Sequence, residues 1–561
     1  MIYNFLNIFL LLVSFNSFAQ ENTEKNDYFI QEIKNENSEN LFEIGNKYYN
    51  DDLKFIFNNQ KFEEIFDFFE NLPIKNSNYF IQSLVYKILK SEYSVANSNL
   101  SAEEDKFLFQ SRINKLFNSA RFSDIDMIHS KTPTQFDDEN LNLKKIEGFF
   151  LRNEFKNGCE LIKNKSFSDS LSRFKIICNI IAQDFEKARF NISLLKERKK
   201  PGDDLFIELC YNIMGDISTS SSQMLAKNLE EISSLNPILL SSLQIAEVSP
   251  NFEHVRNAST SVLTFILSSP SSSTDIKLYT AEELIRQKRI ENKMLAEIYQ
   301  LINFNKENIE NAIKNYKSLS PVRARSLLYQ ALIYEKDKDL KFELIKTLLK
   351  HSVNDKLFQN ISYLIVDSIN FMELENLSYE ENILIFNIFI SVNDFNSAKD
   401  FLEKVGYKDL IEKDEYLSEV LTYNLLKFLY DESFFSLDKL EKLADKIIKD
   451  DEVSLNAEKI LIISSLLFDF KENLNSKIFK INKIVSKKNY NINPITFSLG
   501  FKYNQKEDYF NSLKILFEIC KEKDVTELNG PEIFLVGKIL LDLKLDEEFK
   551  LFINQLFLNK I

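Results

Sequence analysis

Four cysteines are the residues whose type and placement point most directly to chemistry. Cys159 and Cys178 flank a polar turn around residues 163–169, and positions at equal distances from such a turn face each other in an antiparallel helical hairpin. In an oxidising compartment this spacing predicts a disulfide, with two free thiols as the alternative. Cys210 and Cys520 lie in apolar stretches and are predicted to be buried thiols. No Cys-x-x-Cys motif suggests a redox-active pair.

Metal and cofactor sites have little support in the sequence. The three histidines, His129, His254 and His351, are far apart, whereas zinc needs three or four converging ligands. Each histidine is therefore predicted to lie at the surface or at a helix end. The acidic clusters at 137–139 and 450–452 lack the glycine of a calcium loop and are typical of solvated helix starts. No cofactor and no metal is expected.

Motifs for a catalytic nucleophile or acid are also weak. No G-x-S-x-G, P-loop or G-x-G-x-x-G occurs, and Ser193-x-x-Lys196 lacks the companion motifs of S-x-x-K enzymes. The Glu432-Ser433 dipeptide resembles the catalytic Glu-Ser of soluble lytic transglycosylases, which are exported enzymes with a helical superhelix. The downstream Gly-Leu-Met-Gln stretch of that family is missing. No catalytic residue is predicted, and a degenerate or unrecognised peptidoglycan-processing enzyme is the alternative function.

The first nineteen residues predict export. The apolar run from Phe5 to Phe15 is too short to span a membrane, and Ser17-Phe18-Ala19 places small residues at the positions that a signal peptidase reads. We expect cleavage after Ala19, a periplasmic location and no membrane span in the mature chain. Residues 1–4 contain no Lys or Arg, whereas signal peptides usually carry positive charge there. An amphipathic first helix packed in the core is the alternative.

Composition favours helices over sheets. The chain has 561 residues but only 9 Gly and 9 Pro, which are the residues that tight β-turns require. The 50 Phe are predicted to fill the core. A net charge of −14 argues against nucleic-acid binding, which relies on Lys and Arg. The expected partner is an unknown protein or an envelope polymer.

Helix periodicity extends along almost the whole chain. Capping boxes are predicted at Ser101-x-x-Glu104, Thr280-x-x-Glu283 and Ser378-x-x-Glu381, and Ser320-Pro321 predicts another helix start. Residues 460–468 are apolar nearly all round and predict a buried helix.

A large residue followed three positions later by Ala, Leu or Ile recurs after polar turns, as in Phe185-x-x-Ala188 and Phe395-x-x-Ala398. This element resembles the second half of tetratricopeptide (TPR) hairpins, without a constant period. We therefore predict an all-α, irregular α-solenoid of stacked helical hairpins. The predicted divisions are a signal peptide (1–19), a mobile arm (20–37), an N-terminal helical-hairpin region (38–215), a Ser/Pro-rich helical seam (216–275) and a C-terminal helical-repeat region (276–561).

Several stretches resemble an uncharacterised group of exported helical-repeat proteins of alphaproteobacteria. They are residues 159–195, 235–250, 280–285 and 320–336. The resemblance implies the same compartment and fold and favours pairing of Cys159 with Cys178, but it brings no activity. The function expected from the sequence is therefore a periplasmic, non-enzymatic interaction scaffold.

Overall fold

The computed structural model describes most of the chain from Leu41 onward. The described residues are 41–45, 51–76, 78–95, 99–132, 138–163, 169–198, 203–216, 229, 235–370, 377–404, 421–422, 425–426, 429, 455–470, 500, 502–503, 508–521 and 523–557. Over these residues the protein is all-helical and contains no β-strand. The predicted signal peptide, the predicted arm and residues 432–434 lie outside the described residues.

The helices of the first half are short and closely spaced. They are η1 (Leu41–Glu43), α2 (Asp51–Lys54), α3 (Phe62–Glu70), α4 (Tyr79–Lys90), α5 (Ala102–Asn118), α6 (Phe122–Lys131), α7 (Glu139–Leu151), α8 (Phe155–Ile162), α9 (Asp169–Ile181), α10 (Phe185–Arg198), α11 (Asp203–Ile213), α13 (Pro237–Ile245), α14 (Phe252–Arg256) and α15 (Thr260–Ser268). The last three lie within the Ser/Pro-rich seam.

The second half continues in the same way. Its helices are α16 (Thr274–Arg286), α17 (Asn292–Tyr299), α18 (Lys306–Glu310), α19 (Ala312–Asn315), η2 (Tyr316–Ser318), α20 (Pro321–Tyr334), α21 (Lys338–Val353), α22 (Phe358–Asn370), α23 (Tyr379–Ser391), α24 (Phe395–Lys404), α28 (Leu455–Phe470), α31 (Tyr509–Cys520), η5 (Val525–Glu527), α32 (Gly530–Asp542) and α33 (Asp546–Phe557). The predicted buried helix at 460–468 is confirmed where its side chains are described, since Ile460, Ile463 and Leu466 are fully buried.

Two of the three predicted capping boxes are confirmed. Ser101 and Ser378 each exchange hydrogen bonds with the glutamate three residues later. The box at Thr280 is wrong, because α16 begins at Thr274 and Thr280 is buried in its middle. Helix α20 does begin at Pro321, although the Ser320 side chain makes no capping hydrogen bond.

A single type of turn joins many consecutive helices. The second residue after the helix adopts a left-handed conformation, and the next helix begins two residues later; this occurs at Ala120, Asn153, Gln183, Asn393 and Lys544, with φ between 53° and 61°. The residue after it donates its N–H to a carbonyl five positions back, as Asp184 N does to Asn179 O at 2.8 Å. Glycine usually fills such a position. Here two asparagines, an alanine, a glutamine and a lysine do so, which is how a glycine-poor chain makes helical hairpins.

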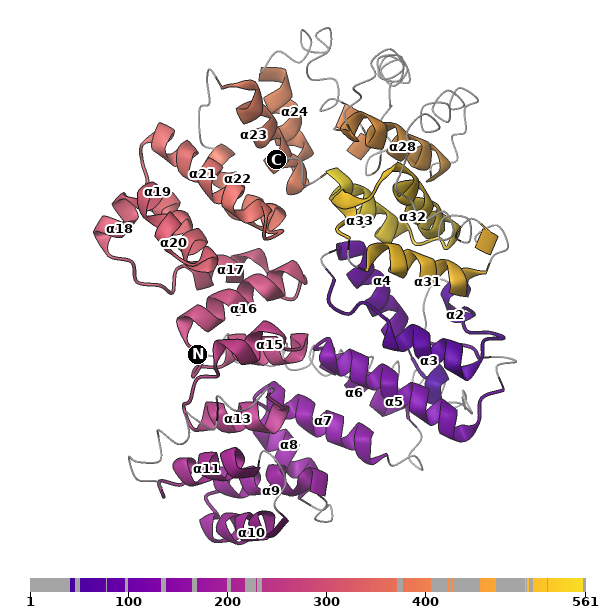
Figure 1. Cartoon of the computed structure of the whole chain (residues 1–561), viewed down its shortest axis with the longest axis vertical. Coiled ribbons are helices and arrows are strands. Elements are labelled where there is room, and N and C mark those ends of the chain that lie inside the picture. The colour runs from indigo at the N-terminus through magenta and orange to yellow at the C-terminus, as the bar shows by residue number, and fades with distance from the viewer. Residues whose placement is uncertain are drawn as a thin grey trace, which may run out of the picture.

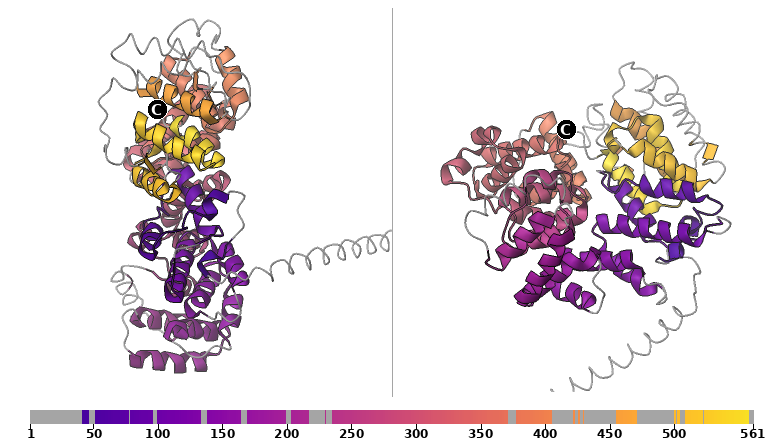
Figure 2. Two further views of the ribbon diagram at one scale, coloured as in Figure 1. Left: turned by 90° about the vertical axis from the view of Figure 1, so that its right-hand side faces the viewer. Right: turned by 60° about the horizontal axis from the view of Figure 1, so that its bottom comes forward.

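The described chain runs along two limbs joined at their lower end (Figure 1). The first limb comprises residues 51–151, 455–470 and 508–557, the lower end residues 155–245, and the second limb residues 252–404. Consecutive helices pack on each other along this path, and α15 of the second limb also packs on α5 and α7. Seen from the side the array is narrow (Figure 2).

The last described helix, α33, packs against α4 near the start of the chain (Figure 1). Phe80 and Phe552 meet with ring centroids 5.0 Å apart. The backbone N–H of Tyr79 donates to Gln555 Oε1 at 2.7 Å, and Lys87 Nζ pairs with the buried Glu548 at 2.7 Å. We call this set of contacts the closing contact, because it brings the described ends of the chain together.

Helix α5 holds the first described residues in place with two side chains on one face. The Asp105 carboxylate accepts hydrogen bonds from the backbone N–H groups of Leu41 and Phe42 at 2.8 and 3.0 Å. Arg112 is fully buried and donates to the carbonyls of Phe42, Ile44, Leu89 and Ser91. Residues 41–45 are thereby fixed against the C-terminus of α4.

Candidate functional site

The cysteine pair is the first feature that the sequence analysis singled out. Cys159 on α8 and Cys178 on α9 form a disulfide, with their Cα atoms 5.6 Å apart. Cys210 and Cys520 are free and fully buried, as predicted, and burial raises the pKa of both thiols far above the ordinary value. A thiol held in its protonated form is a poor nucleophile. The pair Cys159–Cys178 thus joins α8 to α9, and burial keeps the other two thiols protonated.

The histidines do not come together. His129, His254 and His351 lie in the last turns of α6, α14 and α21, in agreement with the predicted helix-end positions, and His254 is buried there. Within the described ranges no three His, Cys, Asp or Glu side chains are placed to hold a metal ion.

The remaining sequence motifs place no nucleophile beside a base. Ser193 donates its hydroxyl to the carbonyl of Phe190, and Lys196 lies over the ring of Tyr211. Glu432 and Ser433, the transglycosylase-like dipeptide, lie outside the described residues, as does the acidic cluster at 450–452. None of the described helices is long and apolar enough to cross a membrane.

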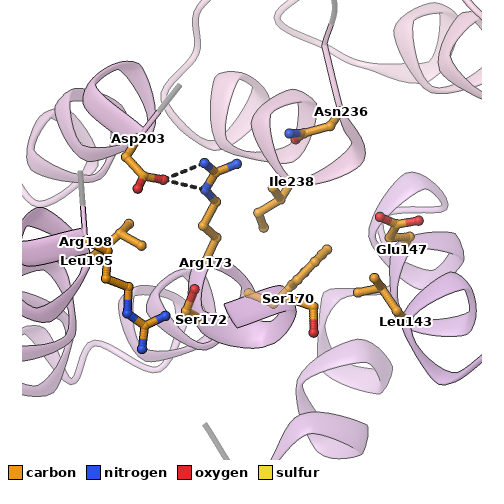
Figure 3. A pocket seen from close by; sticks show the side chains of 11 residues that line it. Leu143, Glu147, Ser170, Ser172, Arg173, Leu195, Arg198, Asp203, Asn236 and Ile238 are labelled. Atoms are coloured by element: carbon orange, nitrogen blue, oxygen red, sulfur yellow. Dashed lines mark hydrogen bonds and ion pairs between the residues drawn. The ribbon is translucent and has the colours of Figure 1, made fainter. Parts of the chain in front are cut away.

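A pocket of about 300 Å³ lies in the lower end of the molecule (Figure 3). Four helices and a helix start contribute its walls: α7, α9, α10, α11 and the beginning of α13. Leu143, Phe174, Leu195 and Ile238 provide apolar surface. The polar lining residues are Glu147, Ser170, Ser172, Arg173, Arg198, Asp203 and Asn236.

An ion pair at one wall gives the pocket its polarity. Arg173 donates both Nε and Nη2 to the same oxygen of Asp203, Oδ1, at 2.9 and 2.5 Å (Figure 3). The Asp203 side chain is almost fully buried, yet its second oxygen, Oδ2, has no hydrogen-bond partner among the described residues. A buried acceptor without a donor is unfavourable by about 1–3 kcal/mol. The wall of the pocket therefore contains a buried acceptor without a donor.

The opposite side of the pocket is formed by the start of α13. Asn236 caps this helix by accepting a hydrogen bond from Leu239 N at 3.0 Å, and Pro237 occupies the first turn. Glu147 on α7 is already bonded to Lys144 Nζ at 2.7 Å. Polar groups of both kinds above an apolar floor suit the binding of a polar ligand. At the edge of the pocket the Ser170 hydroxyl donates to the Glu139 carboxylate at 2.7 Å. The geometry of these groups supports binding of a polar ligand.

A second cluster of titratable side chains is enclosed in the second limb. Arg325 donates Nε and Nη2 to the two oxygens of Glu282 at 2.8 and 2.5 Å and Nη1 to Asp355 at 2.5 Å. Tyr299 donates its hydroxyl to Glu282 at 2.9 Å. Glu282 and Arg325 are essentially inaccessible to solvent. Glu282, Arg325 and Tyr299 are closed to solvent and join α16, α20 and α17, and the more exposed Asp355 adds the turn after α21.

An exposed group of three phenylalanines lies on α3 and α5. The ring centroids of Phe62 and Phe66 are 5.9 Å apart, and those of Phe66 and Phe107 are 5.2 Å apart. Phe107 is 48% exposed, and the other two are half-buried. We call these three rings the aromatic surface. Exposed Glu63 and Glu103 beside it form no salt bridge with any described residue.

Sequence reasoning found neither the pocket nor the aromatic surface. Composition predicts that phenylalanines fill the core, and neither Phe62 nor Phe107 has a local signal of exposure. Comparisons with protein-family models, with curated proteins and with solved structures find no match to this chain. The candidate sites are therefore interpreted from their own geometry.

Proposed function

We propose that the protein is a non-enzymatic interaction scaffold of the bacterial cell envelope, exported to the periplasm after cleavage behind Ala19. The helices would form an irregular α-solenoid of the TPR-like kind, supported by the packing of consecutive helices along both limbs. The disulfide between Cys159 and Cys178 supports an oxidising compartment.

The observation that carries the proposal is the aromatic surface. Exposed phenylalanine rings that touch each other leave apolar area in water, and such clusters are characteristic of protein-interaction sites. Glu63 and Glu103 give its edge a negative charge. The partner that fits is a protein segment with apolar side chains next to Lys or Arg, because the opposite charge steers the encounter and the apolar contact holds it.

A photocrosslinking experiment in cells tests the proposal. A photoreactive amino acid replaces Phe107 in one strain and Phe190 in a matched strain, since Phe190 is 64% exposed on α10 but lies outside the aromatic surface. We expect a reproducible crosslinked protein from position 107 only. Identical products from both positions, or none from position 107, would remove the proposal.

A charge variant sharpens the same test. Glu103→Lys should weaken capture of the crosslinked partner about tenfold or more, and more so at low ionic strength, because exposed charges are screened by salt. Glu253→Lys is the control, since Glu253 is exposed on α14 in the second limb. Equal capture by both variants would show that the negative edge plays no part.

A further inference from the structure

The junction between the two limbs contains a group of charges that the aromatic surface and the pocket do not involve. The turn after α16 lies against α4: Gln82 Nε2 donates to the carbonyl of Arg286 at 3.2 Å, and Lys288 Nζ lies 3.9 Å from the ring centroid of Tyr79. Arg289 follows in the same turn. It lies close enough to Arg121 at the start of α6 for the two charges to repel each other.

Tyr86 of α4 lies at the centre of this group. The Arg121 guanidinium lies 3.7 Å and Lys90 Nζ 4.5 Å from its ring centroid. The Tyr86 hydroxyl donates to the Asp124 carboxylate at 3.0 and 3.2 Å. Asp124 is the carboxylate that acts on both arginines, so positive charge predominates here.

Neither arginine has the partner that a desolvated guanidinium requires. Among the described residues no carboxylate lies within salt-bridge distance of Arg121 or Arg289, and the Nε atom of each is buried without an acceptor. Burial, and then the charge of Arg121, lowers the pKa of Arg289 to about 10. Burial likewise lowers the pKa of Arg121. Both groups remain charged at neutral pH, and the Tyr86 ring and the Asp124 carboxylate offset only part of their mutual repulsion and lost hydration.

An oxyanion would supply the missing negative charge. A guanidinium presents parallel N–H donors that match the two oxygens of a carboxylate or phosphate group. Arg121, Arg289 and Tyr86 are each half-buried, so an anion can reach them from solvent while much of its surface is shielded. Shielding strengthens the attraction relative to water.

We propose that Arg121 and Arg289 form a binding site for a small oxyanion, a carboxylate or phosphate group, which bridges the two limbs. The two residues are 168 positions apart and belong to different limbs, so a bound anion holds α6 against the turn after α16. Asp124, kept in place by Tyr86, limits the site to one anionic group.

Calorimetric titration of the full chain with inorganic phosphate and, separately, with glutarate tests the site. Ionic strength is held constant with sodium chloride. The wild type should bind at least one of the two anions saturably. The anion that binds shows whether the site takes a phosphate or a carboxylate group. Arg289→Gln and Arg121→Gln should each weaken binding about tenfold or more, since each removes one charge-assisted contact. Arg256→Gln, which removes an exposed arginine of α14, should bind as the wild type does.

Thermal unfolding without added anion separates a binding role from a structural one. Arg289→Gln should leave the midpoint unchanged or raise it, because it removes an unpartnered cation, whereas the anion should raise the midpoint of the wild type only. Absence of saturable binding up to about 10 mM, equal binding by the glutamine variants, or a lowered midpoint of Arg289→Gln without anion would overturn the proposal.

Discussion

Two arginines are fully enclosed in the described helices, one in each limb, and their charges are stabilised in different ways. Arg112 in the first limb is surrounded by four backbone carbonyls, and its guanidinium carbon lies 5.2 Å from the ring centroid of Tyr93. Burial lowers the pKa of Arg112 to about 10. Arg325 in the second limb is held by Glu282 and Asp355.

The comparison shows which groups stabilise the buried arginine charge in each limb. Burial alone would lower the pKa of Arg325, but the hydrogen bonds and charge of Glu282 raise it above the ordinary value. Charge is thus neutralised in the second limb by side chains that mutation can remove. In the first limb the charge of Arg112 is not neutralised. It is stabilised only by hydrogen bonds to backbone carbonyls, which no side-chain substitution removes. The first arrangement fixes a backbone path, and the second fixes the relative position of four helices.

Removal of Arg325 should have the largest effect. Arg325→Leu leaves the buried Glu282 with only Arg286, at 3.9 Å, as a cationic neighbour, and we expect a loss of about 3–5 kcal/mol in the free energy of unfolding. Chemical denaturation measures it. The double variant Glu282→Leu/Arg325→Leu should be more stable than Arg325→Leu, because no charge remains buried alone. A double variant as unstable as the single one would show that the pair contributes through shape and not charge.

Removal of Arg112 should lower the free energy of unfolding somewhat less than removal of Arg325. Arg112→Met removes the donors to four carbonyls but leaves no buried charge, and we expect a loss of about 2–4 kcal/mol. The loss should be local at first, so amide hydrogen exchange in residues 41–45 should accelerate before global unfolding. Unchanged exchange in these residues would show that Asp105 alone holds them.

The two tyrosines next to these arginines allow a finer comparison. Tyr299→Phe removes a hydrogen bond to the buried carboxylate of Glu282, for which about 1.5–3 kcal/mol is expected, whereas Tyr93→Phe removes one to the carbonyl of Ile88, for which about 0.5–1.5 kcal/mol is expected. Both changes delete one hydroxyl in a fully buried ring, so each serves as the control for the other. Equal losses would contradict the distinction between the limbs.

The pH dependence of stability should give the smallest effect. Burial, and then the charge of Arg325, lowers the pKa of His351, so the unfolded chain takes up a proton at higher pH than the folded one. Stability from this group is therefore complete above about pH 6.5 and falls as the pH drops through that value. His351→Gln should flatten the slope between pH 5 and 7, while Arg112→Met should leave it unchanged. An identical slope in His351→Gln and the wild type would exclude this contribution.

Features that depend on local spacing could be predicted from the sequence. The helices, the capping boxes at Ser101 and Ser378 and the Cys159–Cys178 pair each follow from residues close together in the chain. The box at Thr280 failed for a physical reason. The capping-box pattern needs only four residues and so occurs by chance inside helices. The apolar face of α16 continues upstream of Thr280, and the helix therefore begins at Thr274.

Features that depend on distant partners could not be predicted. Arg112 meets carbonyls 21 to 70 residues away, and Arg325 meets a glutamate 43 residues away. The pocket needs five helices, and Asp203 gives no sign in the sequence that one of its oxygens is unpartnered. The left-handed turns at Gln183 and Lys544 also escape prediction, because the residue types that usually mark such turns are glycine and asparagine.

The closing contact has a consequence for the synthesis of the protein. Tyr79 and Gln555 are 476 residues apart, so at ordinary translation speeds the ribosome needs roughly 25–95 s to make the second after the first. During that interval the face of α4 that contains Phe80 has no native partner to cover it. A chain that lacks α33 therefore presents the apolar surface around Phe80 to its surroundings, wherever it folds.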